Sequence, residues 1–130
     1  MELLARSDAA VMCAPLTPET HRMIGAGELR IMKRSAFFIN VGRGATVDED
    51  ALARALAERR IAGAAIGVFE QEPPSAGHPL YALGNAIVSP HVSGFIPSYD
   101  EKCLELFTDN LQRYLEGGPL LNLVDRARGY

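Results

Sequence analysis

Short apolar runs alternate with amphipathic stretches along the chain. Four runs rich in Ala, Val, Ile and Phe are bounded by turn-forming residues, which predicts strands at residues 9–14, 36–39, 64–69 and 86–89. Residues 9–14 are apolar throughout, so this strand is expected to be covered on both faces within a parallel sheet.

Helical spacing of apolar side chains marks the segments between the strands. It predicts helices near residues 27–34 and at about 98–115. Thr17 followed by Pro18 also predicts the N-cap and first position of a short helix. Asp48 is the expected N-cap of a further helix, because two acidic residues follow it and two arginines lie near the end of the stretch, in agreement with the helix dipole.

Strands that alternate with helices of these lengths predict an α/β fold. Right-handed crossovers are expected to place about four strands in parallel, with flanking helices and a long C-terminal helix. The expected sheet is part of a doubly wound, Rossmann-type sheet, and in such sheets ligands bind at the carboxyl ends of the strands. Arg43, Glu72 and His91 each follow a different predicted strand. We therefore expect them to converge on one edge of the sheet.

These three residue types suit the reduction of a keto acid. An imidazole that titrates near neutral pH can protonate a carbonyl oxygen, and a guanidinium can grip a neighbouring carboxylate with two parallel hydrogen bonds. Taken singly, each residue has a plainer interpretation: Gly42-Arg43-Gly44 as a tight turn, Glu72 as an exposed loop carboxylate and His91 as a strand exit. Their joint placement at strand ends favours the functional interpretation.

Composition and charge narrow the class of partner. The net charge is −3 and the basic residues are scattered, which argues against nucleic acid or an anionic membrane. No apolar run has the length of a membrane span and no secretory leader is recognisable, so a cytoplasmic location is expected. Cys13 and Cys103 are expected to be reduced, buried thiols, and no metal site is predicted. His21 and His78 are expected at the surface, and the apolar stripe of the last helix is expected in core or interdomain packing.

Several motifs occur together in register. They are Ser7-Asp8, the stretch 15–20, Met32-Lys33 with the stretch 36–44, Val47-Asp48 with Ala51-Leu52, Val68-Phe69 with Glu72-Pro73, and the stretch 89–94. In this order they resemble the D-isomer-specific 2-hydroxyacid dehydrogenases, in the second half of the Rossmann-type nucleotide-binding domain and the C-terminal tail. The resemblance covers nearly the whole chain.

The resemblance implies roles for individual residues. His91 would be the general acid/base, Glu72 would orient it and stabilise its protonated form, and Arg43 would bind the carboxylate and carbonyl of a 2-oxo acid. The cofactor would be NAD or NADP. The residues implied to contact it are Ala14, Pro15, Val41, Gly42, Arg43, Gly67, His91, Val92 and Ser93. At Gly67 the family usually has an aspartate that accepts hydrogen bonds from the nicotinamide carboxamide.

Neither glycine pair completes a dinucleotide fingerprint. Gly25-Ala26-Gly27 follows no clear strand, and Gly42-Arg43-Gly44 has Val47 where the third glycine belongs. We therefore expect a truncated chain, with the phosphate loop and most of the substrate domain preceding residue 1. On this expectation residues 1–118 are the C-terminal half of a nucleotide-binding domain, and residues 119–130 return to the substrate domain.

The sequence thus predicts an NAD(P)-dependent oxidoreductase of small 2-hydroxy or 2-oxo acids such as glyoxylate or hydroxypyruvate. The 130 residues by themselves are expected to be inactive and to associate into a homo-oligomer, because the outer edge of strand 9–14 would be unpaired. The alternative is a non-catalytic remnant or interaction module that keeps the half-domain fold and pairs with intact subunits. An upstream segment with a strand, Gly-x-Gly-x-x-Gly and a helix would favour the enzyme.

Overall fold

The computed structural model describes residues 2–130, which form two compact units. The first unit ends at Val92, and the second comprises Ser93–Tyr130. The boundary between the two units lies just after the short segment that follows the last strand of the first unit. The assignment of residues 1–118 to half of a nucleotide-binding domain stays a prediction.

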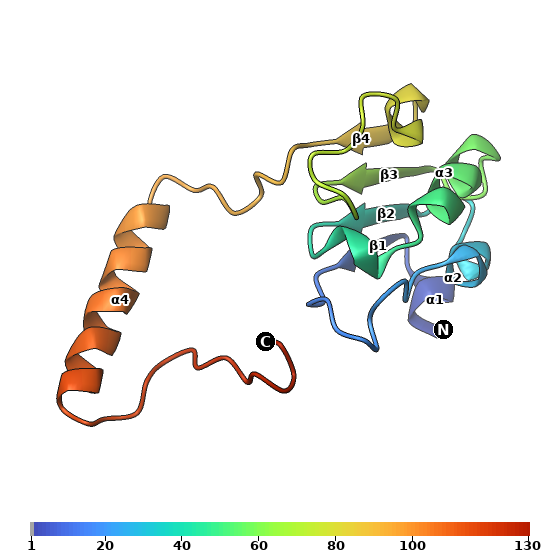
Figure 1. Cartoon of the computed structure of the whole chain (residues 1–130). Helices are drawn as coiled ribbons and strands as arrows, with labels where there is room; N and C mark the ends of the chain where they lie inside the picture. Colours follow the sequence, from blue (N-terminus) through green and yellow to red (C-terminus); the bar gives the residue numbers. More distant parts are fainter. Residues whose placement is uncertain (1) are drawn as a thin grey trace. The chain divides into compact units, whose positions relative to one another are not determined.

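A four-stranded parallel sheet forms the centre of the first unit. Its strands are β1 (Ala9–Met12), β2 (Phe37–Asn40), β3 (Gly63–Ile66) and β4 (Ala86–Val88), in the order β1-β2-β3-β4 (Figure 1). All three pairings are parallel, and the last residues of the strands lie level across the sheet. The loops that follow the strands therefore leave from the same edge, and the predicted α/β fold is confirmed.

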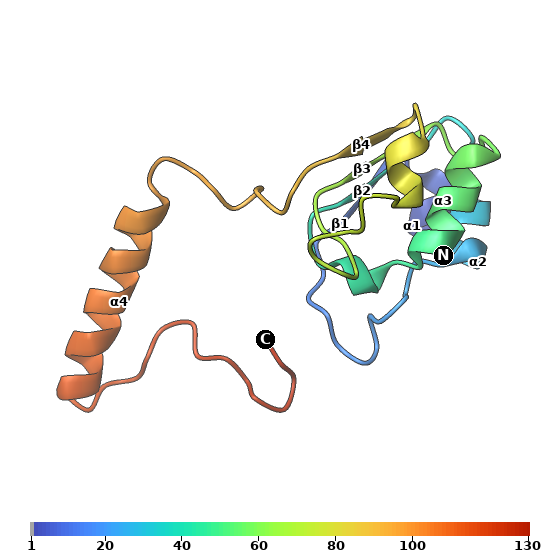
Figure 2. The ribbon, with the colours of Figure 1, turned by 45° about the horizontal axis from the view of Figure 1, so that its top comes forward.

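Three helices lie on one face of this sheet (Figure 2): α1 (Glu2–Arg6), α2 (Ala26–Ile31) and α3 (Glu49–Ala57). Helix α3 begins as predicted, because the Asp48 carboxylate accepts a hydrogen bond from the Ala51 N–H at 2.9 Å. Two short 3-10 helices, η1 (Gly44–Thr46) and η2 (Pro79–Ala82), lie in the connections. The core between helices and sheet is apolar, and its largest fully buried side chains include Phe38, Leu29, Met32, Leu52 and Leu56.

The opposite face of the sheet is open in the described residues of the first unit. The expectation that residues 9–14 are covered on both faces is wrong for this chain. Ala10 and Met12 are buried under the helices, whereas Val11 points the other way and is 57% exposed. Phe37 and Ile87 are exposed with it, because α1, α2 and α3 all pack on the other side. The strand is also shorter than predicted and ends at Met12.

The short helix expected after Thr17 does not form. The Thr17 N–H donates to the Thr20 hydroxyl at 2.7 Å, and that hydroxyl donates to the Pro15 carbonyl at 2.7 Å. These local side-chain contacts satisfy backbone groups that a helix would otherwise pair, so a turn is preferred. Its position between β1 and α2 places residues 15–22 beside the carboxyl end of the sheet.

Helix α4 (Tyr99–Leu115) dominates the second unit, close to the predicted bounds. None of its side chains is buried, and the stripe formed by Leu104, Phe107, Leu111, Tyr114 and Leu115 is exposed. The expected core packing is therefore wrong for the chain as described, and interdomain packing stays a prediction. None of the helices within residues 2–130 is both long and apolar enough to cross a membrane.

Both cysteines are free, as expected, but neither is buried. Cys13 lies beyond the end of β1, where the chain has left the core, and Cys103 lies on α4. An apolar sequence neighbourhood misled the prediction. Side chains alternate along β1, so Met12 is buried while Val11 and Cys13 are exposed, and on α4 the neighbouring Leu104 is itself exposed.

Candidate active site

The turn that carries Arg43 is fixed from beneath by two buried polar side chains. Asn40, the last residue of β2, accepts a hydrogen bond from the Gly42 N–H through Oδ1 and donates to the Arg43 carbonyl through Nδ2, both at 3.1 Å. The Thr46 hydroxyl donates to the same carbonyl at 2.6 Å. Asn40 and Thr46 are 1% and 0% exposed. The sequence analysis gave them no role, although an Asn at a strand end is a recognisable turn signal.

Gly44 brings this turn against the segment that follows β3. A Cβ atom placed on Gly44 would lie 1.8 Å from the Phe69 carbonyl carbon and 2.2 Å from the Glu70 nitrogen. Only a residue without a side chain permits this approach. The Arg43 turn and the loop that leads to Glu72 are therefore in direct backbone contact.

Glu72 has one hydrogen-bond donor for each carboxylate oxygen. The Phe69 N–H donates to Oε1 at 2.9 Å, and the His91 Nδ1–H donates to Oε2 at 2.7 Å. These bonds, together with the positive charges of His91 and Arg43, hold the pKa of the Glu72 carboxyl below its ordinary value. The carboxylate therefore stays ionised and ready to bind a protonated imidazole.

His91 has an unusual backbone conformation, with φ of +40°. Its N–H donates to the Gly67 carbonyl at 3.0 Å, which holds the residue beside the end of β3. Positive φ is costly for a residue with a side chain, by about 1–3 kcal/mol, and such strain is concentrated at functional sites. Because Glu72 occupies Nδ1, the Nε2 atom of the half-exposed ring is the one left to meet a substrate.

The three residues expected to act together thus lie together at the carboxyl edge of the sheet. Glu72 and His91 are in contact, and Arg43 is close enough for its charge to act on Glu72. The Arg43 side chain donates one hydrogen bond, to the Gly42 carbonyl at 2.8 Å, and is otherwise exposed. An exposed planar guanidinium beside a proton donor can bind a carboxylate whose neighbouring carbonyl faces the imidazole.

The residues implied to contact a dinucleotide follow the ends of β1, β2, β3 and β4. Gly42 is buried, and a Cβ there would lie 2.9 Å from the Ala14 carbonyl oxygen. Val41 and Pro15 present exposed apolar groups at this edge. A rim with small and apolar groups beside a proton donor fits the flat nicotinamide ring. Their contact with a cofactor stays a prediction, as do those of Val92 and of Ser93, the first residue of the second unit.

Gly67 is buried but not crowded. A Cβ there would be 3.5 Å from the Asn40 carbonyl oxygen and 3.5 Å from the Ser89 hydroxyl oxygen, which is ordinary contact. The backbone of Gly67 accepts the His91 N–H and donates to the Asn40 carbonyl. The backbone of Gly67 therefore supports His91, while the position lacks the carboxylate that the resemblance leads one to expect for the nicotinamide carboxamide.

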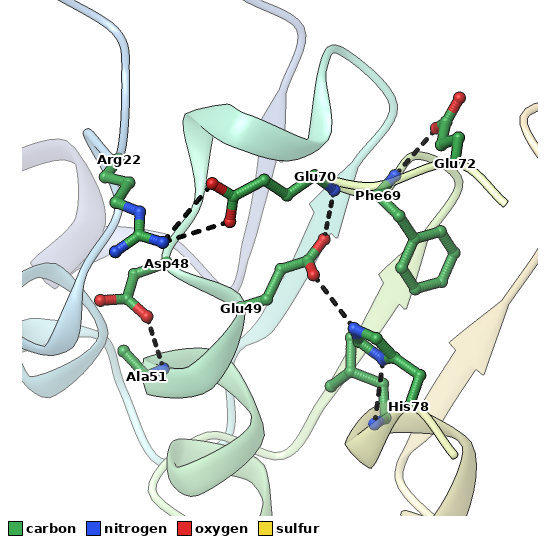
Figure 3. Close-up of polar contacts among 9 residues, drawn as sticks. Arg22, Asp48, Glu49, Ala51, Phe69, Glu70, Glu72 and His78 are labelled. Atoms are coloured by element: carbon green, nitrogen blue, oxygen red, sulfur yellow. Dashed lines mark hydrogen bonds and ion pairs between the residues drawn. The ribbon is translucent and has the colours of Figure 1, made fainter. Parts of the chain in front are cut away.

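His78 is not the surface residue that was expected. Its Nε2 lies 3.0 Å from Oε2 of Glu49, and the two side chains are only 14% and 15% exposed. Oε1 of Glu49 accepts the Glu70 N–H at 2.7 Å, and the Glu70 carboxylate pairs with Arg22 (Figure 3). These contacts join residues 21 and 29 positions apart, so no local pattern in the sequence announces them. His21 is exposed as expected.

The lowered pKa of Glu72 predicts a pH-dependent contribution to stability. A carboxyl whose pKa is lower in the folded than in the unfolded chain stabilises the fold above the unfolded value, and this contribution is lost as the pH falls through the folded pKa. We expect the loss to begin near the ordinary value of 4.5. In Glu72→Gln the acid decline of the unfolding free energy should be shallower than in wild type, measured by urea denaturation at several pH values. An unchanged decline would contradict the described contacts of Glu72.

Comparisons with known proteins agree with this geometry. Residues 1–93 match the family described as "D-isomer specific 2-hydroxyacid dehydrogenase, NAD binding domain". The chain is 41% identical over 125 residues to the glyoxylate reductase of Aeropyrum pernix, covering 96% of this chain and 37% of that protein. It is 44% identical over 123 residues to glyoxylate/hydroxypyruvate reductase B of Cronobacter sakazakii, covering 95% and 38%.

Solved structures share the fold of this chain. The D-isomer specific 2-hydroxyacid dehydrogenase of Xanthobacter autotrophicus Py2 in complex with NADPH and MES matches with a TM-score of 0.91 and 42% identity, over 99% of this chain and 41% of that one. The NAD-complexed dehydrogenase of Lactobacillus delbrueckii matches with a TM-score of 0.83 and 26% identity, over 95% and 41%. The chain thus spans about two fifths of the length of the relatives it matches.

Proposed function

Because this chain belongs to the D-isomer specific 2-hydroxyacid dehydrogenase family, we propose that it carries the proton-transfer and carboxylate-binding groups of an NAD(P)-dependent reductase of 2-oxo acids. The observation that carries the proposal is the 2.7 Å contact between His91 Nδ1 and Glu72 Oε2 at the carboxyl edge of the sheet. A histidine paired in this way keeps one nitrogen for the substrate.

Each residue has a distinct task in this reaction. His91 protonates the carbonyl oxygen in reduction and accepts the proton in the reverse direction. Glu72 fixes the ring orientation and stabilises the imidazolium, through a bond that its low pKa keeps available. Arg43 binds the carboxylate of the substrate in a two-bond grip that a lysine cannot reproduce. The Asn40 and Thr46 contacts hold the Arg43 backbone in place.

The nicotinamide half of NAD or NADP would lie against the residues that follow β1, β2 and β3 at the carboxyl edge of the sheet. The bound cofactor supplies the hydride, and the chain supplies position, charge and a proton. Relatives of known structure were crystallised with NADPH, NADP or NAD. The exposed Val41 and Pro15 are the apolar groups available to a flat ring.

The proposed substrates are glyoxylate and hydroxypyruvate. Relatives 41–44% identical to this chain are a glyoxylate reductase and a glyoxylate/hydroxypyruvate reductase. A short 2-oxo acid presents a carboxylate next to a carbonyl, which matches Arg43 beside His91. We further propose a cytoplasmic location, with neither nucleic acid nor membrane as partner, in keeping with scattered charges and a net charge of −3.

The 130 residues by themselves are proposed to be inactive and to associate. The His91 and Glu72 side chains are 45% and 36% exposed, and a site open to water does not strengthen electrostatic interactions with a substrate. The edge of β1 that faces away from β2 has no strand partner in the described residues, and such edges pair with other chains. Sedimentation of the chain tests association, and a stable monomer would contradict it.

A second function is favoured by the open face of the sheet. Exposed apolar patches mark interaction surfaces, and Val11, Phe37 and Ile87 are 57%, 52% and 73% exposed on this face. A non-catalytic module that pairs with intact subunits would use it. A reductase assay separates the two functions, because a module needs no reactive His91.

The function is tested in a hybrid in which this chain replaces the matched region of the Xanthobacter autotrophicus dehydrogenase. We expect the hybrid to reduce glyoxylate or hydroxypyruvate with NADH or NADPH, and the isolated 130 residues to give no turnover. Arg43→Lys should lower kcat/KM by about two orders of magnitude, since an ammonium loses the two-bond geometry.

Arg54→Lys is the matched control, because Arg54 is exposed on α3 and away from the site. It should leave kcat/KM unchanged. A hybrid that folds, binds cofactor and shows no reduction would refute the reductase function. Near-normal kcat/KM in Arg43→Lys would refute the role given to Arg43.

A further inference from the structure

Glu49 and His78 form a largely buried pair, with 15% and 14% of the two side chains exposed, that no step of the proposed reaction uses. We propose that they are positioning residues, which hold the backbone at Phe69 and Glu70 so that Glu72 faces His91. The consequence for catalysis rests on the proposed function, whereas the positioning itself is a property of the fold. The hydrogen bonds of their side chains go to the Glu70 and Leu80 N–H groups and to each other, and none goes to Arg43 or His91 in the described residues.

The Glu49 carboxylate makes two contacts at once. Oε1 accepts the Glu70 N–H at 2.7 Å, and Oε2 is 3.0 Å from His78 Nε2 (Figure 3). Glu49 is the first residue of α3, which is anchored by the Asp48 cap and by the buried side chains of the helix. The carboxylate is therefore held in place by α3, and its bond to the Glu70 N–H restricts the loop that follows β3.

Both ring nitrogens of His78 have a partner. The Leu80 N–H donates to Nδ1, at 3.4 Å, so Nδ1 is an acceptor and Nε2 is the donor to Glu49. The ring also lies edge-on to Phe69, with 5.2 Å between the ring centroids, which adds an apolar contact to the same residue whose N–H binds Glu72.

Two successive backbone N–H groups of the loop are bound to two different carboxylates. Phe69 donates to Glu72 at 2.9 Å, and Glu70 donates to Glu49 at 2.7 Å. Fixing the second bond fixes the peptide plane between the two residues, and with it the direction of the loop. Release of Glu70 would let Phe69 turn away from Glu72, which would then keep only its contact with His91.

The titration of Glu72 reports this arrangement without any turnover. Its pKa is lowered by the His91 and Phe69 bonds, and a purely structural loss elsewhere would not change it. Carbon-detected NMR of the Glu72 carboxyl in the 130-residue chain, as a function of pH, gives that pKa directly. Far-UV circular dichroism and amide spectra show which variants remain folded.

Four variants separate positioning from general damage. In Glu49→Gln one carboxylate oxygen is replaced by an NH₂ group, so the side chain cannot accept from both the Glu70 N–H and His78 Nε2. In His78→Phe the ring nitrogen that bonds to Glu49 is removed. In both we expect the Glu72 pKa to rise toward the ordinary value of 4.5. His78→Gln keeps an N–H donor and should keep the low value. Asp50→Asn removes the same charge at the next position of α3, which is exposed, and should leave the pKa of Glu72 unchanged.

An unchanged Glu72 pKa in folded Glu49→Gln or His78→Phe would overturn the positioning role. An equal rise in Asp50→Asn would overturn it as well, because the effect would then not depend on the contacts that Glu49 makes. A rise of the Glu72 pKa in Glu49→Gln and His78→Phe but not in Asp50→Asn supports the positioning role, whether or not the hybrid is active. Absence of reduction by the hybrid would refute the proposed function and not the positioning role. If His78→Phe does not fold, Glu49→Gln compared with Asp50→Asn decides the outcome.

Discussion

Replacing His91 by alanine is expected to lower the kcat of the hybrid by about two to four powers of ten, the usual contribution of a positioned acid or base. The substrate would still be bound by Arg43, so KM should change much less. The reason is geometric: the 2.7 Å bond from Nδ1 to Glu72 directs the opposite nitrogen outward from the strand end. Steady-state reduction of glyoxylate and hydroxypyruvate measures both constants.

His21→Ala is the control for this experiment, because His21 is exposed in the turn after β1 and contacts neither Arg43 nor Glu72. It should leave kcat and KM unchanged. A His91→Ala hybrid that retained near-normal kcat would show that the proton comes from elsewhere, and the proposed acid/base role would have to be abandoned.

Gly44→Ala is expected to cause the largest loss of stability among single changes at the site, about 3 kcal/mol. The added methyl group would lie 1.8 Å from the Phe69 carbonyl carbon, and backbone atoms cannot move aside as a flexible side chain can. The Arg43 turn and the Glu72 loop would be forced apart. Urea denaturation of the 130-residue chain measures the unfolding free energy.

Gly77→Ala provides the comparison, since nothing lies within 4 Å of a Cβ at that loop position. Its unfolding free energy should stay within about 0.5 kcal/mol of wild type. If Gly44→Ala were equally harmless, the close approach of the two loops would not exist in solution, and the common site of Arg43 and Glu72 would lose its basis.

Features that depend on neighbouring residues could be predicted from the sequence. The Asp48 cap and the acidic first turn fixed the beginning of α3, and helical spacing located α4 to within one residue. The order of Arg43, Glu72 and His91 after successive strands was enough to place them together. This follows because parallel strands end at one edge of a sheet, whatever the details of the loops.

Tertiary structure alone decided the contacts between distant loops. Glu49 meets Glu70 and His78 across 21 and 29 positions, a relation that depends on how α3 lies against the loop after β3. The sequence likewise showed that Val11 is apolar, but not which face of the sheet the helices cover. Local hydrogen bonds and periodicity act over a few residues, whereas packing selects one of several arrangements that satisfy them equally well.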